Sequence, residues 1–198
     1  MCGLSSARFA AAIVAIDTAN AADPTSVVVR GSTHPLALVH GQLAAEWVVR
    51  LHPDADEAWL LAARAHHLRR WEVPRTNYAP GRAGYLKWKR DQRVRHAADV
   101  GSLLVEVEYE SDEIERVQAL VRRDHLATDL GSQAVEDAAC LVFIETQLAE
   151  ISTKLEHDHL IDVIRKTAKK MSPAALAAVS TIPLGEVEQS LLASVLAN

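Results

Sequence analysis

Apolar residues recur every three or four positions along most of the chain, which is the spacing of an amphipathic helix. The segments with this pattern are residues 5–20, 35–51, 54–70, 85–105, 111 onward, 133–152 and 155–171, with short helices expected after Pro173 and Gly185. The alternating stretch 105–109 favours a helix end over a strand, and residues 23–34 favour a loop with a short extended piece. The sequence therefore predicts an all-α fold, a single bundle of eight or nine helices.

Local signals set the expected boundaries of these helices. Pro53 ends the second helix, and Asp54 is a suitable N-cap for the third, since its carboxylate accepts from the first free N–H groups. Ser111 is expected to cap the fifth helix for the same reason. Residues 71–84 contain two prolines and two glycines and form the longest predicted loop. Loops of this length in compact domains are often functional.

The composition indicates one globular domain. The chain has 198 residues, 49% hydrophobic and 24% charged, and contains only two cysteines, Cys2 and Cys140. No disulfide between them is expected, which is typical of a reducing compartment. No segment approaches the roughly 20 uncharged apolar residues that span a bilayer. We therefore expect a cytoplasmic protein with no membrane association.

The charge is distributed unevenly along the chain. Residues 64–95 hold ten basic residues and only Glu72 and Asp91 as acids, a net charge of +8, although the whole chain carries −5 and the remainder therefore −13. One basic segment in an acidic protein favours a local anion site over a surface that wraps a polyanion. A solvated helix face is the alternative. Nucleic acid is not the partner that we expect.

Helical geometry directs three residues of metal-binding types toward the interior. His40 shares its helix face with Leu36, Leu43 and Trp47, and His66 shares one with Trp59 and Ala62. Asp137 lies on the face of Cys140, Leu141 and Ile144, where an unpaired carboxylate is costly to bury. Each has a simple structural explanation, but imidazole and carboxylate groups on three helices together suit a divalent transition metal. His67 lies about 100° around the helix from His66, so it reaches the same site only from the edge of that site.

Four segments resemble the HD-domain phosphohydrolases, which are helical metal-dependent enzymes. The resemblance lies in residues 40–47, 61–68, 96–104 and 135–139, and it covers about residues 35–145, with 155–198 as a C-terminal helical extension. It implies that His40, His66, His67 and Asp137 hold the metal. It also implies that His96 and His125 lie nearby, as supporting groups or as ligands of a second ion.

The chain is also similar, over nearly its whole length, to the family called domain of unknown function 4202. The segments that carry this similarity are residues 65–75, 81–88, 113–120, 135–143 and 160–167. That family has no established activity, so the similarity says more about fold than about function.

One departure from the HD pattern affects the expected chemistry. The HD enzymes have His-Asp at the middle position, where this chain has His66-His67. Replacing a carboxylate by an imidazole removes one negative charge and favours Zn, Fe, Co, Ni or Mn over Mg. The same replacement makes loss of metal and activity an open alternative.

Arginines follow the histidine segment and suit a phosphate group. Arg69, Arg70, Arg75 and Arg82 are candidates because guanidinium binds phosphate through two parallel hydrogen bonds. Lys170, by contrast, is expected only to interact with a helix dipole. The first hypothesis is a metal-dependent phosphohydrolase acting on a nucleotide or small phosphorylated metabolite. The alternative is a non-catalytic anion- or nucleotide-binding module. The apolar C-terminal helix also allows a homodimer.

Overall fold

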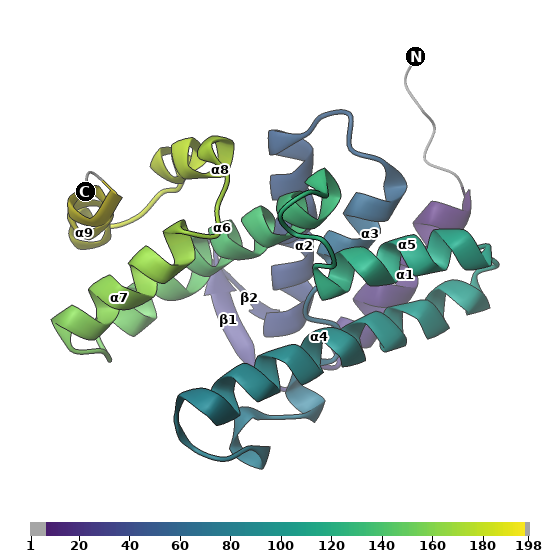
Figure 1. The fold of residues 1–198 in the computed structure, drawn as a ribbon, viewed down its shortest axis with the longest axis horizontal. Coiled ribbons are helices and arrows are strands. Elements are labelled where there is room, and N and C mark those ends of the chain that lie inside the picture. Colours follow the sequence, from purple (N-terminus) through teal and green to yellow (C-terminus); the bar gives the residue numbers. More distant parts are fainter. Residues whose placement is uncertain (1–6, 197–198) are drawn as a thin grey trace.

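The computed structural model describes residues 7–196, and in this range the chain forms nine α-helices and one β-hairpin (Figure 1). The helices are α1 (Ala7–Ala21), α2 (Leu36–Leu51), α3 (Glu57–Ala65), α4 (Gly81–Glu106), α5 (Ser111–Arg122), α6 (Leu130–Ser152), α7 (His157–Ala168), α8 (Pro173–Ala178) and α9 (Glu186–Leu196). The predicted all-α fold is confirmed. Strands β1 (Ser26–Val29) and β2 (Ser32–Pro35) pair antiparallel within the segment expected to be a loop. Residue 5, the expected start of the first helix, and Cys2 lie outside the described residues.

The helices are arranged around α2 and α6, which cross near the centre of the molecule (Figure 1). α2 packs on both α3 and α6, and α3 also packs on α5. α4 and α5 lie side by side as a long antiparallel pair, while α7, α8 and α9 contact the other side of α6. No helix in residues 7–196 combines the length and the apolar run needed to cross a bilayer.

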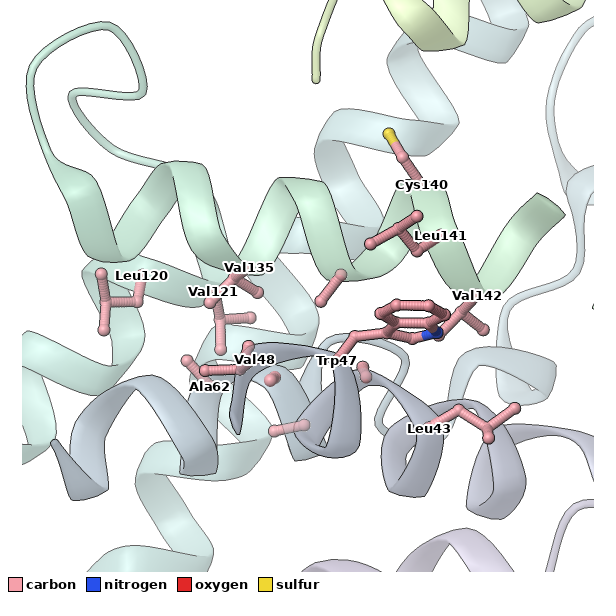
Figure 2. Packing of buried hydrophobic residues seen from close by; sticks show 14 of the residues in the cluster. Leu43, Trp47, Val48, Ala62, Leu120, Val121, Val135, Cys140, Leu141 and Val142 are labelled. Carbon is pink, nitrogen blue, oxygen red and sulfur yellow. The ribbon is translucent and has the colours of Figure 1, made fainter. Parts of the chain in front are cut away.

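One hydrophobic core connects all of these layers. Trp47 of α2 lies beside Leu141 and Val142 of α6, and Val48 of α2 lies beside Val121 of α5 (Figure 2). The same core extends to Ile16 in α1 and Val195 in α9. Because burying apolar surface is the main favourable term in folding, this continuity makes the C-terminal helices part of the same packed unit.

Several helix ends differ from the sequence prediction. The N-cap of α3 is Asp56, whose carboxylate accepts from the Trp59 N–H at 3.0 Å, rather than Asp54. Glu110, not Ser111, precedes α5, and its side chain forms a capping box with Glu113. α3 stops at Ala65 instead of about residue 70. A short 3₁₀ turn follows over Arg70–Glu72, with another over Arg75–Asn77 and a third over Val179–Thr181.

Candidate functional site

Four histidines meet where α3 ends. His40 comes from α2, His66 and His67 follow α3, and His96 comes from α4. The ring centroids are 4.0 Å apart for His66–His67, 5.6 Å for His40–His67 and 6.3 Å for His67–His96. The close approach of α2 to α3 depends on Gly41, because a Cβ at this position would lie 2.4 Å from the Arg64 carbonyl oxygen.

Helix α1 fixes the turn that carries two of these histidines. Arg64 at the end of α3 forms an ion pair with Asp17. The Asn20 side-chain oxygen accepts a hydrogen bond from the Arg69 N–H at 3.1 Å. Arg69 has φ of +51°, in the left-handed region that a non-glycine residue seldom adopts. The chain therefore reverses sharply here and directs Arg70 back toward the histidines.

A hydrogen-bond chain defines the protonation of His40 and His67. The Thr146 hydroxyl donates its one proton to the Val142 carbonyl at 2.7 Å, so it accepts from His40 Nε2 at 3.0 Å. His40 Nδ1 then carries a lone pair and accepts from His67 Nδ1, 3.4 Å away. His67 Nε2 is consequently left with a lone pair.

His66 and His96 are also buried, and some of their ring nitrogens have no hydrogen-bond partner among the described residues. His66 Nδ1 donates to the Ala63 carbonyl at 2.8 Å, and its Nε2 is buried without a hydrogen-bond partner among the described residues. Neither ring nitrogen of His96 makes a hydrogen bond of ordinary geometry within residues 7–196. The interior thus holds imidazole nitrogens whose lone pairs are unused.

Burial keeps all four imidazoles neutral at pH 7. Burial, reinforced by the Arg70 guanidinium, lowers the pKa of His40 to about 4 and that of His96 to about 3. Burial also lowers the pKa of His66 and of His67 well below the usual value, with added repulsion from Arg123 and from the neighbouring His66, respectively. Neutral imidazole can accept a hydrogen bond or bind a metal.

Beside three of these histidines lies a cavity of about 260 Å³ with a basic wall. The charged residues that line it are Arg70, Lys89, Arg93, Arg123, Lys170 and Glu136, and its remaining wall includes His66, His67, His96, Tyr85, Cys140 and Phe143. Burial raises the pKa of the Cys140 thiol to about 11, so this residue is uncharged. With the histidines neutral, five cations and one carboxylate give the cavity a formal charge of +4.

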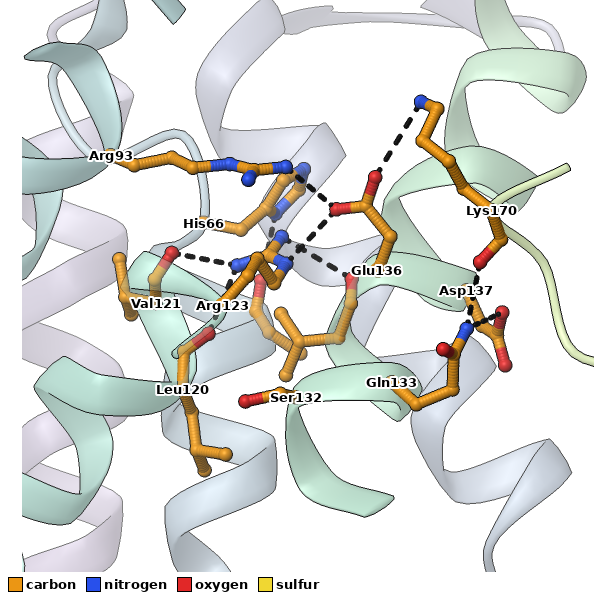
Figure 3. A network of polar contacts seen from close by, with 12 residues as sticks. His66, Arg93, Leu120, Val121, Arg123, Ser132, Gln133, Glu136, Asp137 and Lys170 are labelled. Carbon is orange, nitrogen blue, oxygen red and sulfur yellow. Dashed lines mark hydrogen bonds and ion pairs between the residues drawn. The ribbon is translucent and has the colours of Figure 1, made fainter. Parts of the chain in front are cut away.

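Glu136 holds three of the cations together (Figure 3). Its Oε2 lies 2.9 Å from an Arg93 nitrogen and 3.2 Å from Arg123 Nε, and its Oε1 lies 3.5 Å from Lys170 Nζ. Burial opposes ionisation of this carboxyl, but Arg123, Arg93 and Lys170 outweigh burial and lower its pKa. Glu136 is therefore an ionised group that organises the cavity wall.

Arg123 is the buried member of this network. It follows α5 with φ of +66°, and its guanidinium donates to the carbonyls of Leu120, Val121 and Val135 (Figure 3). Its side chain is only 4% exposed. Arg123 thus contributes positive charge to the cavity, while its Nη1 and Nη2 atoms donate to the backbone and its Nε faces Glu136.

Arg70 and Lys89 form no ion pair with a carboxylate in the described part of the chain. Arg70 stacks on the Trp88 ring, 4.4 Å from its centroid, and burial lowers its pKa to about 10. Burial and the nearby charges of Lys170 and Arg93 also lower the pKa of Lys89. These two cations are the most available to an external anion.

Asp137 does not line this cavity. It is buried, as the sequence predicts, but its Oδ1 accepts from the Gln133 side chain and from the Ser172 N–H, each at 2.8 Å. The same Gln133 nitrogen donates to the Lys170 carbonyl at 2.8 Å (Figure 3). Asp137 therefore anchors the segment that follows α7.

Most of the other predicted residues also lie off the cavity wall. Arg75 donates to the carbonyls of Tyr78, Ala79 and Gly81 and so closes its own loop. The Arg69 carbonyl accepts from Arg95, and Arg82 is exposed on the first turn of α4. His125 is exposed in the loop before α6. Of the four predicted phosphate-binding arginines, Arg70 alone is among the residues lining the cavity.

The metal-ligand set expected from the sequence, His40, His66, His67 and Asp137, stays a prediction. Residues 7–196 contain no group of three or more His, Cys, Asp or Glu side chains arranged to hold a metal ion. The reason is rotation about α6: one helical step of about 100° separates Glu136, which faces the cavity, from Asp137, which faces the C-terminal segment. The histidines are thus brought together without their expected carboxylate.

Sequence reasoning did not single out Arg123, Glu136 or Lys170. Lys89 and Arg93 were counted only as part of the basic segment. The available signal was weak: Glu136 adjoins Asp137, and a lysine at a helix end is ordinarily a solvated group. Only the packing of α4, α5, α6 and the segment after α7, which contains Lys170, brings these charges to one cavity.

Comparison with known proteins identifies a family. No curated protein and no solved structure matches the chain, so the resemblance to HD-domain enzymes stays a prediction. One family model covers residues 10–192, which includes every helix that lines the cavity. The chain therefore belongs to the family described as Domain of unknown function (DUF4202).

Proposed function

We propose that this protein binds a small phosphorylated metabolite in the cavity lined by α4, α6 and α7 and by residues that follow α3, α5 and α7. The observation that carries the proposal is the charge of the wall, where five cations face one carboxylate. Cations that are partly removed from water favour an anionic ligand, because otherwise their desolvation is not compensated. Arg and Lys donors are the groups that proteins use for phosphate.

The shape of the cavity supports a small ligand over nucleic acid. Its volume of about 260 Å³ is at the lower end of ligand pockets, which span roughly 300–1,000 Å³. Several cations of the basic segment are used inside the fold, since Arg64 pairs with Asp17, and Arg95 pairs with Glu72. These contacts leave less positive surface for a phosphate backbone.

A binding assay with inorganic phosphate tests the proposal. We expect calorimetry to detect phosphate binding, and Arg70→Gln to weaken it at least tenfold, because Arg70 lines the cavity without a carboxylate partner. Arg82→Gln is the matched control, since Arg82 is exposed and lies off the cavity wall. Equal loss in both variants, or no binding by the unmodified protein, would overturn the proposal.

Metal-dependent phosphoester hydrolysis is the second candidate. It is favoured by the four neutral imidazoles and by the unused lone pair of His66 Nε2. Elemental analysis of purified protein separates the candidates. Hydrolysis predicts about one transition-metal ion per chain that is lost in His66→Ala, followed by turnover of nucleotides when metal is added. A metal-free protein that still binds phosphate favours the non-catalytic module.

A further inference from the structure

We propose that the ligand of this cavity carries two phosphate groups close together, as in a diphosphate or a compact bisphosphate. This inference rests on the proposed phosphate-binding function and specifies the class of ligand. It follows from the number of charges, from their depth in the cavity and from the size of the space.

The number of charges exceeds what one phosphate neutralises. The cavity wall has a formal charge of +4 after Glu136 is counted. A phosphomonoester carries about 1.5 to 2 negative charges at pH 7, so one such group leaves about half of the excess unbalanced. Two adjacent phosphate groups bring close to the charge that is needed.

The cations lie at two depths, which gives two positions for phosphate. Arg93 and Lys170 have side chains that are 34% and 39% exposed, so they lie toward the opening. Arg123, at 4% exposed, lies in the interior beside His66 (Figure 3), and Arg70 stacks on the Trp88 ring. One phosphate near Arg70 and a second near Lys170 and Arg93 would use both sets.

Glu136 holds the outer cations close to one another. Its two oxygens contact Arg93, Arg123 and Lys170, which would otherwise repel one another. The carboxylate offers a single negative charge to three cations, so their donors are only partly used. An incoming phosphate adds charge there without displacing Glu136 from Arg123.

Size limits what else the ligand can carry. A volume of about 260 Å³ is small for a ligand pocket, which suits a diphosphate with a small substituent. A long polyphosphate or an oligonucleotide would extend beyond the wall that carries the charge.

The test compares inorganic phosphate with pyrophosphate and with methylenediphosphonate, which cannot be hydrolysed, by calorimetry at constant ionic strength. We expect both two-phosphate probes to bind at least tenfold more tightly than phosphate. Lys170→Gln is expected to weaken binding of both two-phosphate probes and so to reduce this preference to about threefold or less. Lys169→Gln is the matched control, because the neighbouring Lys169 is exposed and does not line the cavity.

The outcomes distinguish this inference from the function on which it rests. If phosphate and pyrophosphate bind with equal affinity and Arg70→Gln weakens both, the cavity binds one phosphate and the two-phosphate inference is wrong. If Lys169→Gln removes the preference as strongly as Lys170→Gln, overall charge and not this cavity causes it, which also overturns the inference. If neither anion binds, the proposed function itself fails. Circular dichroism and thermal unfolding of each variant verify that it is folded.

Discussion

Two polar regions are buried against α6, and they differ in how their charges are compensated. Around Glu136, three cations share one carboxylate, and two more cations line the same cavity. Around Asp137, one carboxylate oxygen accepts from Gln133 and Ser172 and holds the chain after α7, while the other has no hydrogen-bond partner among the described residues. The first region has an excess of charge that an external anion can compensate. The second has its donors satisfied internally and serves the fold.

Removing the carboxylate of the first region gives the largest expected effect. Glu136→Gln leaves buried Arg123 and its two neighbouring cations without their anion, and we expect the free energy of unfolding to fall by about 3–5 kcal/mol. Urea denaturation measures this change. Glu150→Gln, which removes an exposed pair with Lys154, is expected to cost less than about 1 kcal/mol. A similar small cost for Glu136→Gln would contradict the assigned network.

The pH dependence of the free energy of unfolding tests whether the histidines beside the cavity are held neutral. The folded-state pKa values of His40 and His96, about 4 and about 3, are depressed below the unfolded value of about 6.5, so the unfolded state binds more protons. The stability is therefore fully present above about pH 6.5 and is lost as the pH falls toward 3. At pH 5 we expect a loss of about 2 kcal/mol for each of the two residues.

Urea denaturation at pH 7 and pH 5 measures this loss. The control is His157→Gln, because His157 is exposed at the start of α7, and this variant should keep the pH dependence of the unmodified protein. A free energy of unfolding that is constant between pH 7 and pH 5 would show that these imidazoles are not held neutral.

A change in the second region is expected to be smaller and to leave metal content unaffected. Asp137→Ala leaves the Ser172 N–H and the Gln133 side chain without their acceptor, which we expect to cost about 1–3 kcal/mol and to speed amide exchange at Ser172. Asp137→Asn keeps an oxygen at the same place and should cost less. If Asp137→Asn loses a bound metal ion while its stability is unchanged, this result would support the predicted role of Asp137 as a metal ligand.

The smallest expected change concerns the approach of α2 to α3. Gly41→Ala places a methyl group 2.4 Å from the Arg64 carbonyl oxygen, so the helices must separate, at a cost of about 1–2 kcal/mol. Separation also moves His40 away from His67, and phosphate affinity should fall a few-fold. Gly185→Ala is the control, since its added methyl meets only the flexible end of Glu188. Unchanged stability in Gly41→Ala would mean that the contact relaxes without cost.

The sequence by itself determined the helices and the burial of the key residues. Apolar spacing of three and four specifies one buried face per helix, which places His40, His66 and Asp137 inside, and all three are buried. The basic segment likewise contains Arg70, Lys89 and Arg93, which line the cavity. These properties are local, because they depend on residues within a few turns of one helix.

Only the tertiary structure decided which buried groups share a site. Spacing along α6 gives the direction of Asp137 to within a helix face, but the choice between Glu136 and Asp137 depends on which neighbouring elements cover each face. Arg123 and Lys170 enter the cavity from the ends of α5 and α7, positions that carry no periodic signal. Because charges act through space, the excess of positive charge became visible only when residues 70, 123 and 170 were brought together.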